Sequence, residues 1–199
     1  MNRLLILIVC ILVGVTTPMP AFAQRVPEAD QVPLDFRRTT LVVRDIEASL
    51  AFYRDALGMV VTYDNYIRTP REATTNEAAE RSLRLVLLRA NDPYIGVIGL
   101  MQYFKPERPE RPTRADTELR PGDVVLVFNI QDQDTVFARA SAAPGVVVGE
   151  APHLVTYPGY GGQGVIRVNF ASVFDPDGHY IELNQVLDAL SYSRILVTR

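Results

Sequence analysis

The stretch Phe174-Asp-Pro-Asp-Gly-His-Tyr-Ile-Glu-Leu-Asn184 decides the fold. Its first half is typical of a tight turn, because Pro fixes φ, Asp hydrogen-bonds to its own main chain, and Gly adopts positive φ at little cost. Its second half alternates, which predicts a strand with Ile181 and Leu183 on one face and Glu182 on the other. A carboxylate placed there, just past a turn, indicates a binding group or a member of an ion pair.

The same frame occurs 83 residues earlier, at Asn91–Leu100, where Asp-Pro again precedes a strand. A second repeat has an offset of 87, with Asp45 and Gly58 matching Asp132 and Gly145. Asp is a favoured helix N-cap and Gly a favoured C-terminal stop, so each half is predicted as β-α-β-β-β. We therefore predict an α+β fold of two βαβββ modules, whose curled mixed sheets form a cleft.

A chain of 199 residues suffices for one domain built from two such modules. A run of prolines and charges separates the halves and is typical of a linker. The expected segments are a signal peptide (1–23), a mobile lead-in (24–33), the first module (34–104), a Pro-rich linker (105–121), the second module (122–187) and a C-terminal tail (188–199), with 34–187 together forming one domain.

The first 23 residues resemble a secretory signal peptide. A polar start with Arg3 precedes an apolar run over Leu4–Val15, and Ala21-Phe22-Ala23 is a small-x-small cleavage site. The run is short for a spanning helix, so we expect cleavage after Ala23, export to a bacterial periplasm and no stable membrane insertion. An uncleaved anchor is the alternative.

Charge and cysteine content exclude several classes of function. The net charge is −3, from 20 basic and 23 acidic residues, and no basic face recurs at helical spacing, so nucleic acid is not an expected partner. The single cysteine, Cys10, would leave with the signal peptide, so the mature chain can form no disulfide.

The two repeated stretches resemble a known group of proteins. Thr40–Tyr53 followed by Leu57-Gly58 resembles the opening of the vicinal-oxygen-chelate superfamily, and Asp175–Glu182 resembles its closing strand. The superfamily includes glyoxalase I, fosfomycin-resistance proteins, bleomycin-resistance proteins and extradiol dioxygenases. The resemblance covers about Leu34 to Val186 and implies the same fold and a U-shaped cavity.

In the metal-using members, up to four strand positions lining the cavity each supply one ligand. The resemblance places these positions at Arg38, Gly99, Val125 and Glu182. Only Glu182 can coordinate a cation, and one carboxylate does not make a divalent metal site. We therefore expect neither the family metal nor another cofactor.

Arg38 and Glu182 are the strongest candidates for a functional pair. The guanidinium would take the place of the metal and hold Glu182, or would bind an anionic ligand, and a structural ion pair is the alternative. By strand parity, the expected ligand-binding residues are Arg38, Thr40, Val97, Gly99, Val125, Val127, Tyr180 and Glu182.

Two further residues are weaker candidates for ligand binding. His153 is a candidate general base near the edge of the second module, although no partner for it is visible. Arg167 lies on the strand before the closing hairpin, and the sequence leaves its face open.

These observations favour an exported protein that binds a small anionic or aromatic molecule without the family metal. One alternative is a glyoxalase-like lyase, isomerase or dioxygenase relative that uses Glu182 as a catalytic general base, with an atypical metal or none. Another is a non-catalytic interaction module. Because homodimers are common in the family, the resemblance also implies a homodimer.

Overall fold

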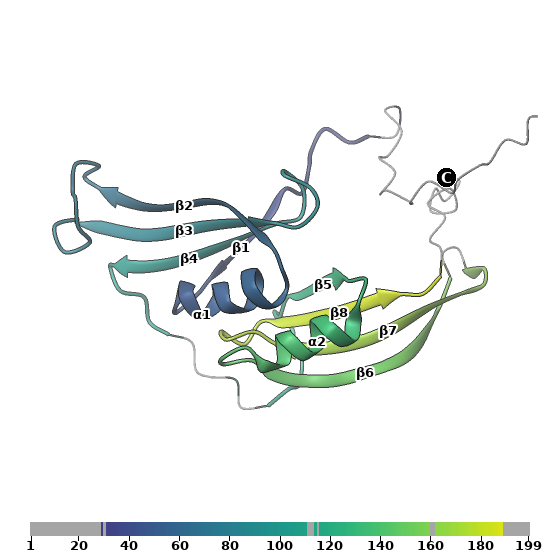
Figure 1. Cartoon of the computed structure of the whole chain (residues 1–199). Coiled ribbons are helices and arrows are strands. Elements are labelled where there is room, and N and C mark those ends of the chain that lie inside the picture. Colours follow the sequence, from purple (N-terminus) through teal and green to yellow (C-terminus); the bar gives the residue numbers. More distant parts are fainter. Residues whose placement is uncertain (1–28, 30, 111–113, 115, 160–161, 189–199) are drawn as a thin grey trace, which may run out of the picture.

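The computed structural model describes residues 29, 31–110, 114, 116–159 and 162–188, so the expected signal peptide and nearly all of the tail lie outside the described residues. The chain folds into two modules with the same order of elements (Figure 1). The first module contains β1 (Arg38–Val42), α1 (Ile46–Leu50), η2 (Ala51–Ala56), β2 (Val60–Thr69), β3 (Arg81–Arg89) and β4 (Val97–Lys105). The second contains β5 (Val125–Asn129), α2 (Gln133–Ala142), β6 (Val147–Pro158), β7 (Val165–Phe174) and β8 (Tyr180–Val186).

Each module has one four-stranded mixed sheet, ordered β1-β4-β3-β2 in sheet A and β5-β8-β7-β6 in sheet B. The first and last strands of a module run parallel, and the other pairs are antiparallel. The parallel ladders share a register, because Arg38 pairs with Val97 and Val125 pairs with Tyr180. These positions correspond under the two repeat offsets, which confirms the predicted α+β fold of two modules.

Both helices begin in the same way. The carboxylates of Asp45 and Asp132 each accept a main-chain N–H of the first turn, as expected for N-caps. The strand beside each helix adds a second acceptor: Gln102 Oε1 lies 3.1 Å from the main-chain N of Ile46, and Gln185 Oε1 lies 3.2 Å from that of Gln133. The repeat therefore extends to hydrogen bonds that the sequence analysis did not identify.

The first helix changes geometry along its length. After α1 the chain continues as the π-helical segment η2, where the N–H of Leu57 donates to the carbonyl of Phe52 at 3.0 Å. Gly58 then ends the helix with φ of +80°, as predicted. None of the helices that the structure describes is long and apolar enough to cross a membrane.

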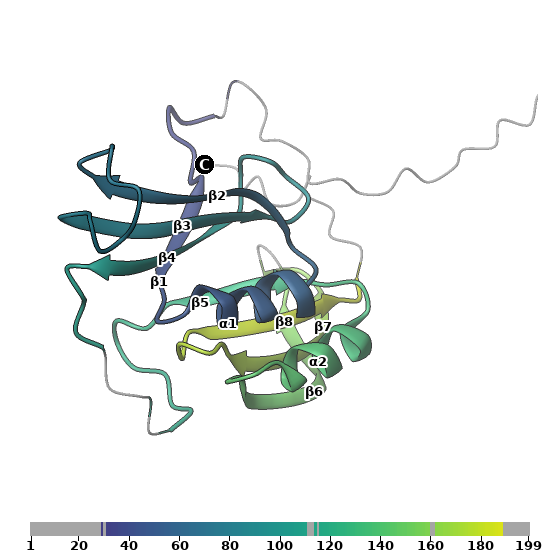
Figure 2. The same ribbon diagram turned by 60° about the vertical axis from the view of Figure 1, so that its left-hand side comes forward.

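One hydrophobic core joins the modules. The α1–η2 helix lies between sheet A and sheet B, as Figures 1 and 2 show. Its buried Leu50, Phe52 and Tyr53 belong to the same cluster as Leu100 of sheet A and Leu183 of sheet B. Since side chains alternate along a strand, each sheet has this core face and an opposite, non-core face.

Two segments differ in detail from what the sequence pattern predicts, which is a short helix over 77–81 and a strand that opens at 146–148. No helix forms near Glu77; Lys105 Nζ binds the main-chain carbonyls of Glu77 and Ala79, and β3 starts at Arg81. Strand β6 starts at Val147, where the sequence predicts a strand to open, and continues to Pro158. Register shifts between Val148 and His153 interrupt its alternation and so hid its full length from the sequence pattern.

Candidate functional site

The four candidate residues of the first module share one face of sheet A. Arg38 pairs with Val97 and Thr40 with Gly99, while Ile98, between the two pairs, and Leu41, next to Thr40, are buried in the core. Alternation therefore places all four on the non-core face. A Cβ at Gly99 would lie 2.7 Å from Thr40 Oγ1. The Thr40 side chain thus occupies the space that a larger residue at position 99 would need.

The second-module candidates lie on the corresponding face of sheet B. Val125 pairs with Tyr180 and Val127 with Glu182, while Ile181 between them is buried in the core. Val127 is 61% exposed, whereas Tyr180 is buried. The parity argument thus gives the correct face for these residues, although their predicted binding role is a separate question.

Arg38 and Glu182 are not joined by an ion pair in the described chain. The Glu182 carboxylate instead accepts a hydrogen bond from Asn184 Nδ2 at 2.9 Å. Asn184 lies two residues along the same strand face, so this contact is local. Both the guanidinium and the second oxygen of the carboxylate therefore retain hydrogen-bonding capacity.

His153 lies on the non-core face of sheet B, where it pairs with Phe170 in the β6–β7 ladder. The two rings meet edge to face, with centroids 5.4 Å apart. The imidazole is exposed, with Nε2 3.7 Å from the Glu150 carboxylate and Nδ1 2.9 Å from the carbonyl of Ala151. His153 thus has a carboxylate neighbour that the sequence did not reveal.

Arg167 lies on the other face of sheet B. It alternates with Val168 and shares the parity of Ala171 and Val173, both of which are core residues. Its guanidinium Nη2 forms an ion pair with Asp188 at 2.6 Å. Arg167 therefore does not share a face with Glu182, and we no longer consider it a candidate ligand-binding residue.

The residues at the family metal positions do not fit a divalent metal. Arg38 is cationic, Gly99 and Val125 offer no donor side chain, and only Glu182 supplies an oxygen. In the described parts of the chain, no group of three or more His, Cys, Asp or Glu side chains is placed to hold a metal ion. We therefore derive no chemistry through a metal here.

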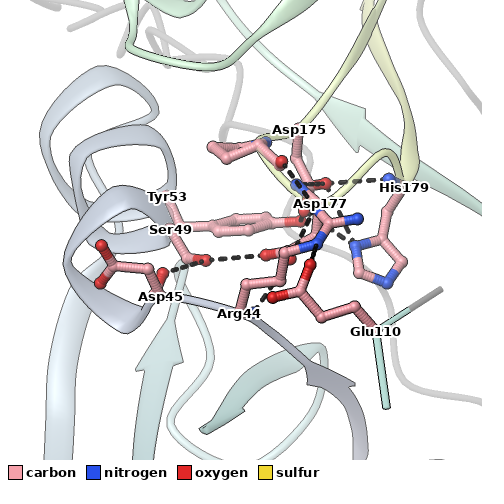
Figure 3. Close-up of polar contacts among 9 residues, drawn as sticks. Arg44, Asp45, Ser49, Tyr53, Glu110, Asp175, Asp177 and His179 are labelled. Carbon is pink, nitrogen blue, oxygen red and sulfur yellow. Dashed lines mark hydrogen bonds and ion pairs between the residues drawn. The ribbon is translucent and has the colours of Figure 1, made fainter. Parts of the chain in front are cut away.

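The turn in the fold-deciding stretch has a role that the sequence analysis missed. Asp175 is 1% exposed, and its carboxylate accepts the Tyr53 hydroxyl of the first module at 2.8 Å (Figure 3). Its oxygens also accept the main-chain N–H groups of Asp177 and His179 and lie 3.0 and 3.1 Å from His179 Nδ1. Asp175 both shapes the turn and ties the two modules together.

Arg44, at the start of the first helix, holds the same turn. Its main-chain N–H donates to Asp177 Oδ1 at 3.0 Å, and its guanidinium lies 3.4 Å from the same oxygen (Figure 3). Arg44 Nε also lies 3.3 Å from the carboxylate of Glu110, in the linker. We call the contacts of Arg44 and Tyr53 with Asp177 and Asp175 the intermodule staple.

Burial controls the protonation of the staple. It raises the pKa of Tyr53 well above its ordinary value, and the Asp175 charge raises it further, so Tyr53 remains a neutral donor. Desolvation also raises the pKa of Asp177.

Under the repeat offset of 87, the counterpart of Tyr53 is Ala140, which is buried and has no hydroxyl. This position of the second module therefore cannot form the same bond.

Comparison with known proteins identifies the fold. The sequence profile of the Glyoxalase/Bleomycin resistance protein/Dioxygenase superfamily matches residues 36–183. A glyoxalase family protein from Bacillus cereus superposes with a TM-score of 0.58 at 15% identity, covering 81% of this chain and all of that protein. Among curated proteins, none matches the sequence significantly.

Two further solved structures are similar to the chain with lower TM-scores. Glyoxalase I of Leishmania major, described as trypanothione-dependent, has a TM-score of 0.45 at 21% identity, covering 74% of this chain and 84% of that one. A glyoxalase/bleomycin resistance protein/dioxygenase family enzyme from Burkholderia phytofirmans gives 0.46 at 18% identity, covering 77% of this chain and all of that one. On the evidence of the profile match and the two-module fold, the chain belongs to the Glyoxalase/Bleomycin resistance protein/Dioxygenase superfamily.

Proposed function

We propose that this protein binds a small anionic or aromatic molecule on the non-core faces of its sheets, without the superfamily metal centre. The observation that carries the proposal is the set of side chains at the four ligand positions, which supplies a guanidinium and one carboxylate where a metal needs several donors. In binding logic the protein would be similar to the bleomycin-resistance proteins.

Arg38 is the residue best suited to recognise such a ligand. Its guanidinium makes no ion pair or hydrogen bond with another residue in the described part of the chain. A planar guanidinium binds carboxylates through two parallel hydrogen bonds and stacks on aromatic rings. The neighbouring Val97 and Thr40 side chains would contact the apolar part of the ligand.

The first experiment measures metal content and thermal stability of protein purified without chelator. We expect metal well below one equivalent per chain, no rise in melting temperature with zinc, nickel or manganese, and a rise with benzoate that Arg38→Gln removes. Near-stoichiometric metal that Glu182→Ala abolishes would overturn the proposal.

An enzymatic function is the second candidate, because Asn184 holds the Glu182 carboxylate at 2.9 Å on a rigid strand. A positioned carboxylate can act as a general base. In glyoxalase and extradiol dioxygenase assays of the wild type and Glu182→Gln, this candidate requires turnover that the substitution removes while benzoate affinity and melting temperature are retained. The absence of turnover in the wild type would favour binding alone.

We also propose that the protein is exported and cleaved after Ala23, as the composition of the first 23 residues suggests. Cell fractionation with mass measurement of the purified chain tests this proposal. The expected product starts at Gln24 and is found in the periplasm, whereas an intact Met1 terminus in the cytoplasmic fraction would contradict it.

A further inference from the structure

A hollow of about 430 Å³ lies at the end of sheet A where β2 and β4 finish and β3 starts. This volume falls within the range of roughly 300–1,000 Å³ that is usual for small-molecule sites. Ile67, Leu83 and Tyr103 supply its apolar lining, and Arg81, Lys105 and Arg108 its charges. None of the residues lining the hollow is acidic.

The hollow belongs to the same face of sheet A as Thr40 and Gly99. Gly99 pairs with Leu87 in the β3–β4 ladder, and four residues further along β4, Tyr103 pairs with Leu83. Because side chains repeat every second residue, these positions share the non-core face. At about 3.3 Å per residue, four residues separate the hollow from Gly99 by roughly 13 Å.

Among the described residues, no carboxylate forms an ion pair with any of the three cations of the hollow, and Lys105 has only a minor charge interaction with the exposed Glu77 carboxylate. Lys105 Nζ donates to main-chain carbonyls, and the Arg108 guanidinium lies 4.6 Å from the ring centroid of Tyr103. Arg81 makes no ion pair within the described part of the chain. By contrast, Arg44, at the intermodule staple, contacts two carboxylates.

Clustered like charges repel one another, so an anion bound among them relieves that repulsion. The effect is local, since the chain as a whole carries a charge of −3. The hollow therefore combines positive charge with apolar walls.

We propose that this hollow binds the anionic group of an amphiphilic small molecule, a carboxylate, sulfonate or phosphate ester with an apolar body. Arg81 and Arg108 contact the anion, and the apolar body lies on Ile67 and Leu83 and extends along the non-core face toward Gly99. This inference rests on the proposed function, because it keeps the ligand on the same face of sheet A, but it assigns the anionic group to Arg81 and Arg108 instead of Arg38.

The test uses two fluorescent probes that differ in one sulfonate: 1-anilinonaphthalene-8-sulfonate and the uncharged N-phenyl-1-naphthylamine. We expect the sulfonate probe to bind more tightly, with an affinity that falls as salt rises. Arg81→Gln/Arg108→Gln should weaken it about tenfold or more, as expected for the loss of charge-assisted hydrogen bonds. The affinity for the uncharged probe should change little. Arg81→Lys/Arg108→Lys should bind the sulfonate probe more tightly than the Gln variant does.

Arg139→Gln serves as the charge-matched control, because this exposed residue lies on α2 in the other module. Octanoate should displace the sulfonate probe, whereas inorganic phosphate should not. Displacement by phosphate alone would overturn the amphiphile assignment. Melting temperatures establish that each variant folds.

The variants also separate this inference from the proposed function. If Arg38→Gln lowers the affinity for the sulfonate probe and Arg81→Gln/Arg108→Gln does not, the hollow is not the anion site but the proposed function stands. If only Arg81→Gln/Arg108→Gln lowers this affinity, the hollow is the anion site and the proposed role of Arg38 fails. If neither does, or if Arg139→Gln has an equal effect, both proposals fail.

Discussion

The Tyr53 hydroxyl donates a 2.8 Å hydrogen bond to the buried carboxylate of Asp175, across 122 residues of sequence. Tyr53 belongs to the helix of the first module, and Asp175 to the closing turn of the second. The apolar core shared by the modules tolerates small shifts, whereas this bond has a defined direction and length. It therefore fixes how the two modules dock.

Tyr53→Phe should lower the free energy of unfolding by about 1–3 kcal/mol, because it removes one hydrogen bond to a buried carboxylate. Urea unfolding of the purified variant measures the change. Tyr63→Phe is the matched control, since Tyr63 is 38% exposed on β2 and its hydroxyl makes no hydrogen bond within the described chain. Equal effects of the two substitutions would contradict the assigned role.

Asp177 should make the protein less stable as pH rises. Its pKa is raised above the ordinary 3.8, so the folded state holds the proton more tightly than the unfolded state. The stabilising contribution is complete below 3.8 and is lost as pH rises through the raised pKa. Relative to Asp177→Asn, the wild type should therefore lose stability over that window in urea unfolding measured at successive pH values.

Asp64 supplies the control of opposite sign for that experiment. The Arg84 guanidinium, 2.7 Å away, lowers the pKa of Asp64 below 3.8, so its contribution is present above 3.8 and is lost as pH falls. Relative to Asp64→Asn, the wild type should gain stability as pH rises toward 3.8. If the stability difference from the wild type changed with pH in the same direction for Asp177→Asn and Asp64→Asn, the assigned directions of the two pKa shifts would be contradicted.

Gln102→Met and Gln185→Met should each lower the free energy of unfolding by about 1 kcal/mol, because each removes the acceptor for a main-chain N–H at the start of a helix. The residues occupy equivalent places in separate modules, so the stability losses of the two single variants should add in the double variant. The double variant should still unfold in a single transition. Thermal unfolding followed by circular dichroism tests this, and two separate transitions would show that the modules unfold independently.

Gly99→Ala should destabilise the protein by about 1–3 kcal/mol, because the added Cβ meets Thr40 Oγ1 at 2.7 Å. Thr40→Ala removes the obstructing atoms, so the double variant should recover much of the loss. A double-mutant cycle from urea unfolding measures this coupling. Additive losses would show that Thr40 rotates away without cost.

The fold could be predicted because its signals are local and occur twice. Asp45 and Asp132 start helices through bonds to the next few residues, and Gly58 ends one through its own φ. The full length of strand β6 could not be predicted, because register shifts depend on the partner strand, here β7, and leave no periodic trace in the sequence of β6.

Of the candidate site, only the faces of the residues could be predicted. Parity placed Arg38 and Glu182 correctly on the non-core faces, but it carries no information on the distance between two sheets. The Tyr53–Asp175 bond was hidden for a similar reason, since both residues look like ordinary helix and turn formers until the modules dock. The cations of the hollow come from two strands and the linker, which no sequence window brings together.

The intermodule staple forms only once, because the second module has Ala140 at the position equivalent to Tyr53, and this asymmetry affects which modules can dock with each other. A pair of second modules would bring the buried carboxylate of Asp175 against Ala140 instead of Tyr53, and a carboxylate buried without its donor is costly. In the first module the residue equivalent to Asp175 is Asp92, whose carboxylate accepts the main-chain N–H groups of Tyr94 and Ile95 in its own turn. After duplication the two halves are therefore no longer interchangeable: the second module is a poor partner for its own copy, because its helix has Ala140 where Asp175 needs a hydroxyl.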